Sequence, residues 1–117
     1  MSPSKDFRLR AILAAVPEFD ERTIRPAWSL YVALSAGVHP WPDANHRTAS
    51  LSFDRAVRTG LGLKCALAAA AAADMSAETR RIRDAHGRYR IEELLDPAHP
   101  YRRVMARFEP RLIIESA

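Results

Sequence analysis

The side chains that could do chemistry are concentrated in one short stretch of the chain, residues 38–49. This stretch contains two histidines, His39 and His46, together with Asp43 and Arg47. Two prolines lie between His39 and Asp43, and each fixes its own φ and biases the residue before it toward an extended conformation. We therefore expect a rigid loop that is not helical before Asp43.

A helix is expected to begin where this loop ends, at Asp43 or Asn45, because Asp and Asn are strong N-caps. The residues that follow have helical spacing. Their apolar face comprises Ala49, Phe53, Ala56, Val57 and Gly60. The predicted helix ends near Gly60 or Gly62, and its free N–H groups point at the loop.

The charges at this helix start have the wrong sign for the helix dipole. A helix N-terminus favours anions, and a cation in the first turn costs about 0.3–1 kcal/mol. Nevertheless His46 and Arg47 lie in that turn, and His39 comes just before it. A bound anion would explain the arrangement, because backbone N–H groups, a helix dipole and an arginine together form a phosphate site.

Two further side chains near this anion site are candidates for catalytic roles. Asp43 can hold a magnesium ion, which takes one or two carboxylates plus phosphate oxygens. The helix dipole disfavours an imidazolium, so His39 should be neutral and able to accept a proton from a hydroxyl. In the simpler alternative, His39 only makes a hydrogen bond in a turn and Asp43 only caps the helix. Trp41 is expected to anchor the loop in the core.

Length and charge limit the kind of protein. A chain of 117 residues forms one small domain that buries roughly 65% of its unfolded surface. The net charge of +4 is carried by 16 Arg and 2 Lys spread along the chain, which allows acidic or phosphorylated partners. We expect Arg80, Arg81 and Arg83 to form a solvated helix face rather than a nucleic-acid surface, because no aromatic residues accompany them.

The single cysteine and the apolar runs bear on location. Cys65 excludes an internal disulfide, and it is expected to be buried and inert. A reducing, cytoplasmic location follows as the default. The apolar run Ala11–Val16 is too short for a secretion signal. The run Cys65–Ala73 is too short to span a membrane, so no membrane partner is expected.

The pattern of the remaining chain predicts an all-α, single-domain bundle with at most one short β element. The predicted helix Ala27–Ala36, with Pro26 in its first turn and Gly37 as its C-cap, is apolar almost all round and should be central. The other predicted elements are a helix through Val16, an alanine helix Leu63–Met75, a helix Ala77–His86 capped by Ser76 and ended by Gly87, a short strand or turn at Arg88–Ile91, and short helices Glu92–Asp96 and Tyr101–Glu109. The tail Arg111–Ser116 remains open.

The stretch from His39 to Arg47 reads His-Pro-Trp-Pro-Asp-Ala-Asn-His-Arg. It resembles the signature of the Fic/Doc (Fido) family, which is His-Pro-Phe-x-Asp/Glu-Gly-Asn-Gly-Arg-x-x-Arg in Fic proteins and His-x-Phe-x-x-Ala-Asn-Lys-Arg-Thr-Ala in Doc-like ones. The resemblance extends weakly from about Leu30 to Lys64. It implies that residues 1–117 form a single Fido-like domain of the size of Doc.

The resemblance also implies a role for each matching residue. His39 would be the base that activates a target hydroxyl, and Asp43 would be the magnesium ligand. Asn45 would brace the loop. The backbone from Ala44 to Arg47, with the Arg47 guanidinium, would bind the phosphates of ATP or another nucleotide, and His46 would take the place of the Doc lysine.

Three departures from the family pattern affect the predicted activity. Ala44 and His46 replace both glycines, and Ser50 stands where Fic nucleotidyltransferases carry a second arginine. Only Glu18–Arg25 is available for the flap that docks the target. The side chain at His46 makes the chain more similar to the Doc branch, although a neutral imidazole binds phosphate more weakly than an ammonium.

These features favour a Doc-like transferase that moves a phosphoryl group from a nucleotide to the hydroxyl of a target protein. Two alternatives remain: a Fic-type transferase of AMP, and a catalytically silent Fido domain used for binding or regulation. The self-inhibitory helix motif of the family is absent from the sequence. We therefore expect restraint by an antitoxin in trans, as in a toxin–antitoxin pair.

Overall fold

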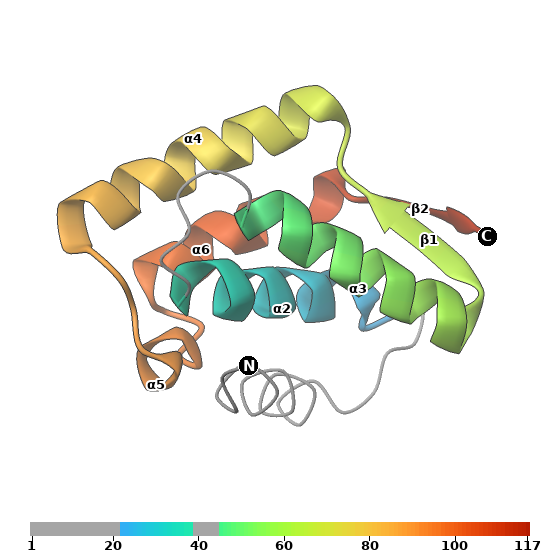
Figure 1. The fold of residues 1–117 in the computed structure, drawn as a ribbon, viewed down its shortest axis with the longest axis horizontal. Coiled ribbons are helices and arrows are strands. Elements are labelled where there is room, and N and C mark those ends of the chain that lie inside the picture. Colours follow the sequence, from blue (N-terminus) through green and yellow to red (C-terminus); the bar gives the residue numbers. More distant parts are fainter. Residues whose placement is uncertain (1–21, 39–44) are drawn as a thin grey trace, which may run out of the picture.

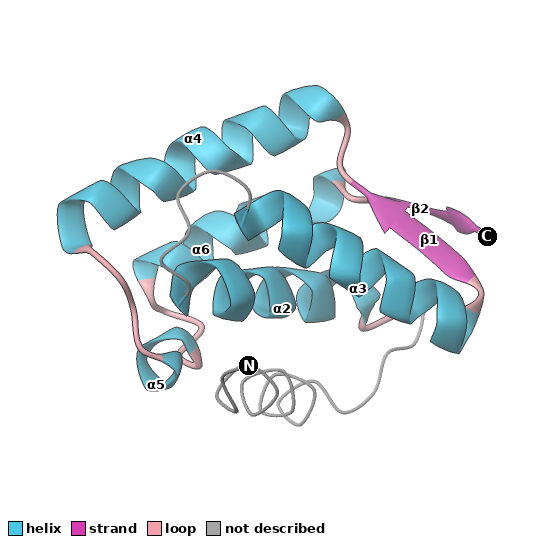
Figure 2. Cartoon of the chain, viewed as in Figure 1, coloured by secondary structure: helices cyan, strands magenta, loops and turns pink. Residues whose placement is uncertain are grey.

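A computed structural model describes residues 22–38 and 45–117, and the predicted helix through Val16 lies outside them. The described chain is mainly helical, with one small sheet, as predicted (Figures 1 and 2). Its elements are α2 (Ile24–Val38), α3 (Asn45–Leu61), β1 (Leu63–Ala66), α4 (Ala69–His86), α5 (Ile91–Leu94), α6 (Pro100–Arg107), the 3-10 turn η1 (Glu109–Arg111) and β2 (Ile113–Ser116).

Helix α2 is the centre of the fold, which confirms its predicted position. It contacts α3, α5, α6 and η1. Its buried residues occur all round the helix, and they include Trp28 and Leu34. The helix is longer than predicted, and the prediction that Gly37 is its C-cap is wrong. Gly37 lies inside the helix, and a Cβ on it would be 2.8 Å from Leu94 Cδ1, so its missing side chain makes room for α5.

Helix α3 begins and ends where the sequence predicts. Ala49, Phe53 and Val57 recur at intervals of four residues and are buried against α2. Ala56 and Gly60, which were predicted on the same face, are exposed. The buried stripe is therefore narrower than expected. Gly62, with φ of 66°, follows the last residue of the helix and redirects the chain.

The segment from Leu63 to His86 differs from the prediction of two helices. Residues 63–66 form β1, which pairs antiparallel with β2 so that Cys65 is opposite Ile114. Helix α4 then runs unbroken through Ser76, which is not a cap, and ends before Gly87, as predicted. The alanine run has high helix propensity, so nothing local interrupts the helix at Ser76. Pairing with β2 overrides that propensity only at β1.

The last third of the chain contains two short helices near their predicted positions. No strand forms at residues 88–90, and Ile91 already begins α5. Helix α6 begins at Pro100, and His99 caps it by accepting the Tyr101 N–H at 3.1 Å on Nδ1. The tail that the sequence left open is strand β2.

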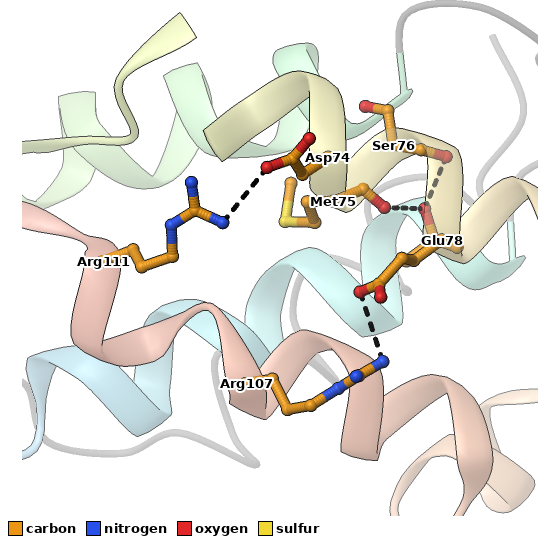
Figure 3. A network of polar contacts seen from close by, with 7 residues as sticks. Asp74, Met75, Ser76, Glu78, Arg107 and Arg111 are labelled. Atoms are coloured by element: carbon orange, nitrogen blue, oxygen red, sulfur yellow. Dashed lines mark hydrogen bonds and ion pairs between the residues drawn. The ribbon is translucent and has the colours of Figure 1, made fainter. Parts of the chain in front are cut away.

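Two ion pairs connect α4 to the α6–η1 segment (Figure 3). Arg107 contacts Glu78 at 3.2 Å, and Arg111 contacts Asp74 at 3.3 Å. Exposed pairs of this kind contribute about 0–1 kcal/mol each. The buried side chains of Met75 and Thr79, on the inner face of α4, contribute more to the packing. None of the described helices is both long and apolar enough to cross a membrane.

Candidate functional site

The structure covers only part of the predicted site. His39, Asp43 and Ala44 lie outside the described residues, as does the side chain of Asn45. The backbone of α3 begins at Asn45, directly after the predicted catalytic loop. The described part of the site is therefore the first turn of α3 and the elements that pack against it.

Arg47 is exposed in the first turn of α3. That turn contains no acidic residue, and α3 is 17 residues long. The positive pole of a long helix thus carries an added positive charge with no carboxylate in its own first turn to offset it. An arginine in this place can donate two parallel hydrogen bonds to a phosphate.

His46 turns toward the core instead of adding a second positive charge. Its Nε2 lies 2.7 Å from the hydroxyl oxygen of Tyr101, and the two rings are nearly parallel with centroids 6.1 Å apart. Burial, together with the smaller effect of the Arg83 and Arg80 charges, lowers the pKa of the imidazole to about 4. His46 is therefore neutral at physiological pH, and any contact with phosphate would come from its backbone or its other ring nitrogen.

Tyr101 is the residue of this region that the sequence analysis did not identify. It is fully buried, and burial raises the pKa of its phenol well above the usual range, so the hydroxyl keeps its proton. Its ring centroid lies 5.4 Å from that of Tyr89. The spacing of Tyr101, Val104, Met105 and Phe108 indicates one buried face of α6. This pattern is enough to predict that Tyr101 is buried in the core, but it does not predict that Tyr101 contacts His46.

Helix α4 adds positive charge near the start of α3. Arg83 is half-buried and Arg80 is exposed. Both act on the His46 imidazole through their charge. The sequence analysis predicted a solvated helix face for these residues. In the folded chain they also contribute to the positive potential around the first turn of α3.

The described residues offer no ready-made metal site. In residues 22–38 and 45–117, no group of three or more His, Cys, Asp or Glu side chains could hold a metal ion. The predicted ligand, Asp43, lies outside these ranges. Ser50, which stands in place of the second Fic arginine, is half-buried on α3.

Cys65 is buried, as predicted, but it lies in β1 rather than at the start of a helix. Burial, with a smaller contribution from the Asp54 carboxylate, raises the pKa of its thiol to about 11. A thiol with such a pKa is almost entirely protonated at pH 7, which makes it a poor nucleophile.

We compared the chain with protein-family models, with curated proteins and with solved structures, and none of the three comparisons found a match. The function is therefore argued from the motif and from the geometry of the described residues.

Proposed function

We propose that the chain is a Doc-like transferase of the Fic/Doc type, which moves the terminal phosphoryl group of a nucleotide to the hydroxyl of a target protein. The observation that carries the proposal is the junction between the motif and α3. The helix begins at Asn45, its first turn has no carboxylate, and Arg47 is exposed there. Free N–H groups and an arginine at a helix N-terminus are suited to binding phosphates.

The proposed chemistry divides between three residues of the motif. His39 accepts the proton of the target hydroxyl, whose oxygen then attacks the terminal phosphorus as the bond to the departing nucleotide breaks. Arg47 and the first-turn N–H groups bind the phosphates. Asp43 would hold magnesium, which neutralises phosphate charge when it is bound. The first turn of α3 offers no second carboxylate, and phosphate oxygens commonly supply further magnesium ligands.

Helix α4 supports this proposal where the sequence departs from the Fic pattern. Ser50 cannot supply the charge of the second Fic arginine. Arg83 and Arg80 are close enough to His46 for their charge to lower its pKa. They therefore add positive charge near the proposed phosphate site.

The direct test uses ATP labelled at the α or the γ phosphate, with magnesium and cell extract. Transfer of label from γ alone is the expected result. Transfer from α would establish AMP transfer instead, and transfer from neither would favour the silent Fido domain. Co-purification with a small partner protein that blocks labelling would identify the proposed antitoxin.

Two variants separate binding from chemistry. Arg47→Ala should weaken ATP binding without lowering thermal stability, because a first-turn cation does not support the helix. Arg55→Ala is the matched control, since Arg55 is an exposed arginine on the same helix two turns later. His39→Ala should reduce the rate by roughly 10²–10⁴ and leave ATP affinity nearly unchanged. Full activity of His39→Ala would contradict the proposal.

A further inference from the structure

The contact between His46 and Tyr101 joins the first turn of α3 to the first turn of α6. These residues are 55 positions apart in the chain, and their side chains meet at 2.7 Å between Nε2 and the hydroxyl oxygen. Their rings are nearly parallel, with an interplanar angle of 20°. The imidazole is thus held through one ring nitrogen, and the two rings lie nearly parallel.

The Tyr101 hydroxyl has a fixed position in the core. The Tyr101 side chain is fully buried beside Tyr89. Thr79 of α4 lies close enough to this hydroxyl to act on the pKa of the phenol, against the larger effect of burial. Thr79 is itself fully buried, and its hydroxyl donates to the Met75 carbonyl at 2.8 Å. Polar groups of α4, α6 and the start of α3 therefore lie close together at this point.

We infer that Tyr101 is a positioning residue for the proposed phosphate site: its hydroxyl holds the His46 imidazole against the core, so that Arg47 and the backbone N–H groups of the first turn face the nucleotide. The inference rests on the proposed function for its link to the nucleotide. The contact by which Tyr101 holds the His46 imidazole involves the protein alone, so it can be tested without any nucleotide.

Loss of the Tyr101 hydroxyl has a defined physical consequence. One ring nitrogen of the imidazole would then lack a hydrogen-bond partner although the ring is partly buried. This cost disfavours the conformation in which the ring points toward the core. Since burial is the main cause of its low pKa, an imidazole released to water should titrate closer to about 6.5. Arg83 and Arg80 on α4 are the charged groups that act on it, and they oppose a complete return to that value. The Tyr101 and Tyr89 phenols keep their protons, since burial raises the pKa of each.

The test compares Tyr101→Phe with Tyr89→Phe. The first variant keeps the aromatic ring and removes only the hydroxyl. The second removes the neighbouring hydroxyl, which donates to the Ile82 carbonyl at 3.3 Å and does not contact His46 through a hydrogen bond. The imidazole of His46 is followed by NMR from pH 4 to 8 and assigned by the loss of its signal in His46→Gln. ATP affinity is measured by calorimetry on the same proteins.

In the wild type and in Tyr89→Phe, we expect His46 to remain neutral down to about pH 5. In Tyr101→Phe, its pKa should rise by about one unit or more and ATP affinity should fall several-fold. A wild-type His46 that titrates near 6.5, or an unchanged titration in Tyr101→Phe, overturns the inference. If Tyr101→Phe does not fold, a wild-type His46 that titrates near 6.5 still overturns the inference.

The failure of the proposed function would look different. A wild-type protein with a low His46 pKa that binds no ATP would contradict the nucleotide site and leave the holding of the imidazole intact. If the wild type binds ATP and Tyr101→Phe binds it equally well despite a shifted titration, the role of Tyr101 in the site is overturned while the function stands.

Discussion

Asp54 joins α3 to β1 by accepting the backbone N–H of Cys65 at 2.8 Å. This hydrogen bond uses Oδ1, while Oδ2 accepts the Arg58 Nε–H at 2.8 Å. One carboxylate thus holds the strand against the helix that precedes it. The contact also places a negative charge beside the buried thiol.

The first prediction concerns this carboxylate. Asp54→Ala leaves the Cys65 N–H without its partner, which should lower the free energy of unfolding by about 1–3 kcal/mol. Urea denaturation followed by circular dichroism measures the change. Arg58→Ala is the control, because that ion pair is half-exposed on the arginine side and should contribute less than about 1 kcal/mol. Equal losses in the two variants would contradict the role of the Cys65 contact.

The second prediction concerns the close approach of α5 to α2. A Cβ at Gly37 would lie 2.8 Å from Leu94 Cδ1, and Leu94 is fully buried. Gly37→Ala should therefore cost about 1–3 kcal/mol through overpacking against the buried Leu94, from which the gain of up to about 1 kcal/mol for alanine inside a helix is subtracted. Gly60→Ala is the matched control, because no heavy atom lies within 4 Å of its added Cβ. That helical substitution should stabilise the protein by up to about 1 kcal/mol, and the two urea midpoints should move in opposite directions.

The third prediction concerns the reactivity of Cys65. Its thiol is buried and has a pKa of about 11. At pH 8, a thiol reagent such as DTNB should modify the native protein slowly and the urea-unfolded protein at once. Rapid modification of the native protein would show that β1 opens readily from the core.

The fourth prediction concerns the acid sensitivity of the fold. The pKa of His46 is about 4 in the folded state and about 6.5 in the unfolded state. Between these values the unfolded chain binds a proton that the folded chain does not, so stability should fall as the pH drops through this window. The limiting slope is about 1.4 kcal/mol per pH unit for one proton.

His46→Gln removes this contribution and leaves the carboxylates unchanged. The difference in melting temperature between pH 7 and pH 5 should therefore be smaller in His46→Gln than in the wild type. If both proteins lose the same stability over this range, the buried neutral state of His46 does not contribute to the pH dependence.

The sequence predicted those parts of the fold that depend on local pattern. Helix α2 is apolar on nearly every side, and this identified it as central. Helix α3 has an N-cap signal at one end and glycines at the other, and its bounds were predicted closely. In both cases neighbouring residues in the chain are enough to define the element.

The parts that were missed depend on contacts between distant residues. Cys65 belongs to a strand only because Ile114 pairs with it, and the alanines that follow gave a stronger helix signal. Similarly, His46 was predicted as a basic group of the site from its position in the helix. Its neutral state results from burial and from the distant Tyr101, Arg80 and Arg83. No local pattern encodes such partners.

The pairing of β1 with β2 has a consequence for the order of folding. The two strands are separated in the sequence by α4, α5 and α6. Bringing them together closes a long loop, and the entropy lost in this step opposes early formation of the sheet. Among the helices in contact with α2, only α3 is its neighbour in the sequence, so α2 and α3 should pack first, and β2 should dock onto β1 after α6 is in place. The strand amides are expected to exchange with solvent deuterium sooner than those in the middle of α2, because two short, partly exposed strands open more easily than the buried central helix.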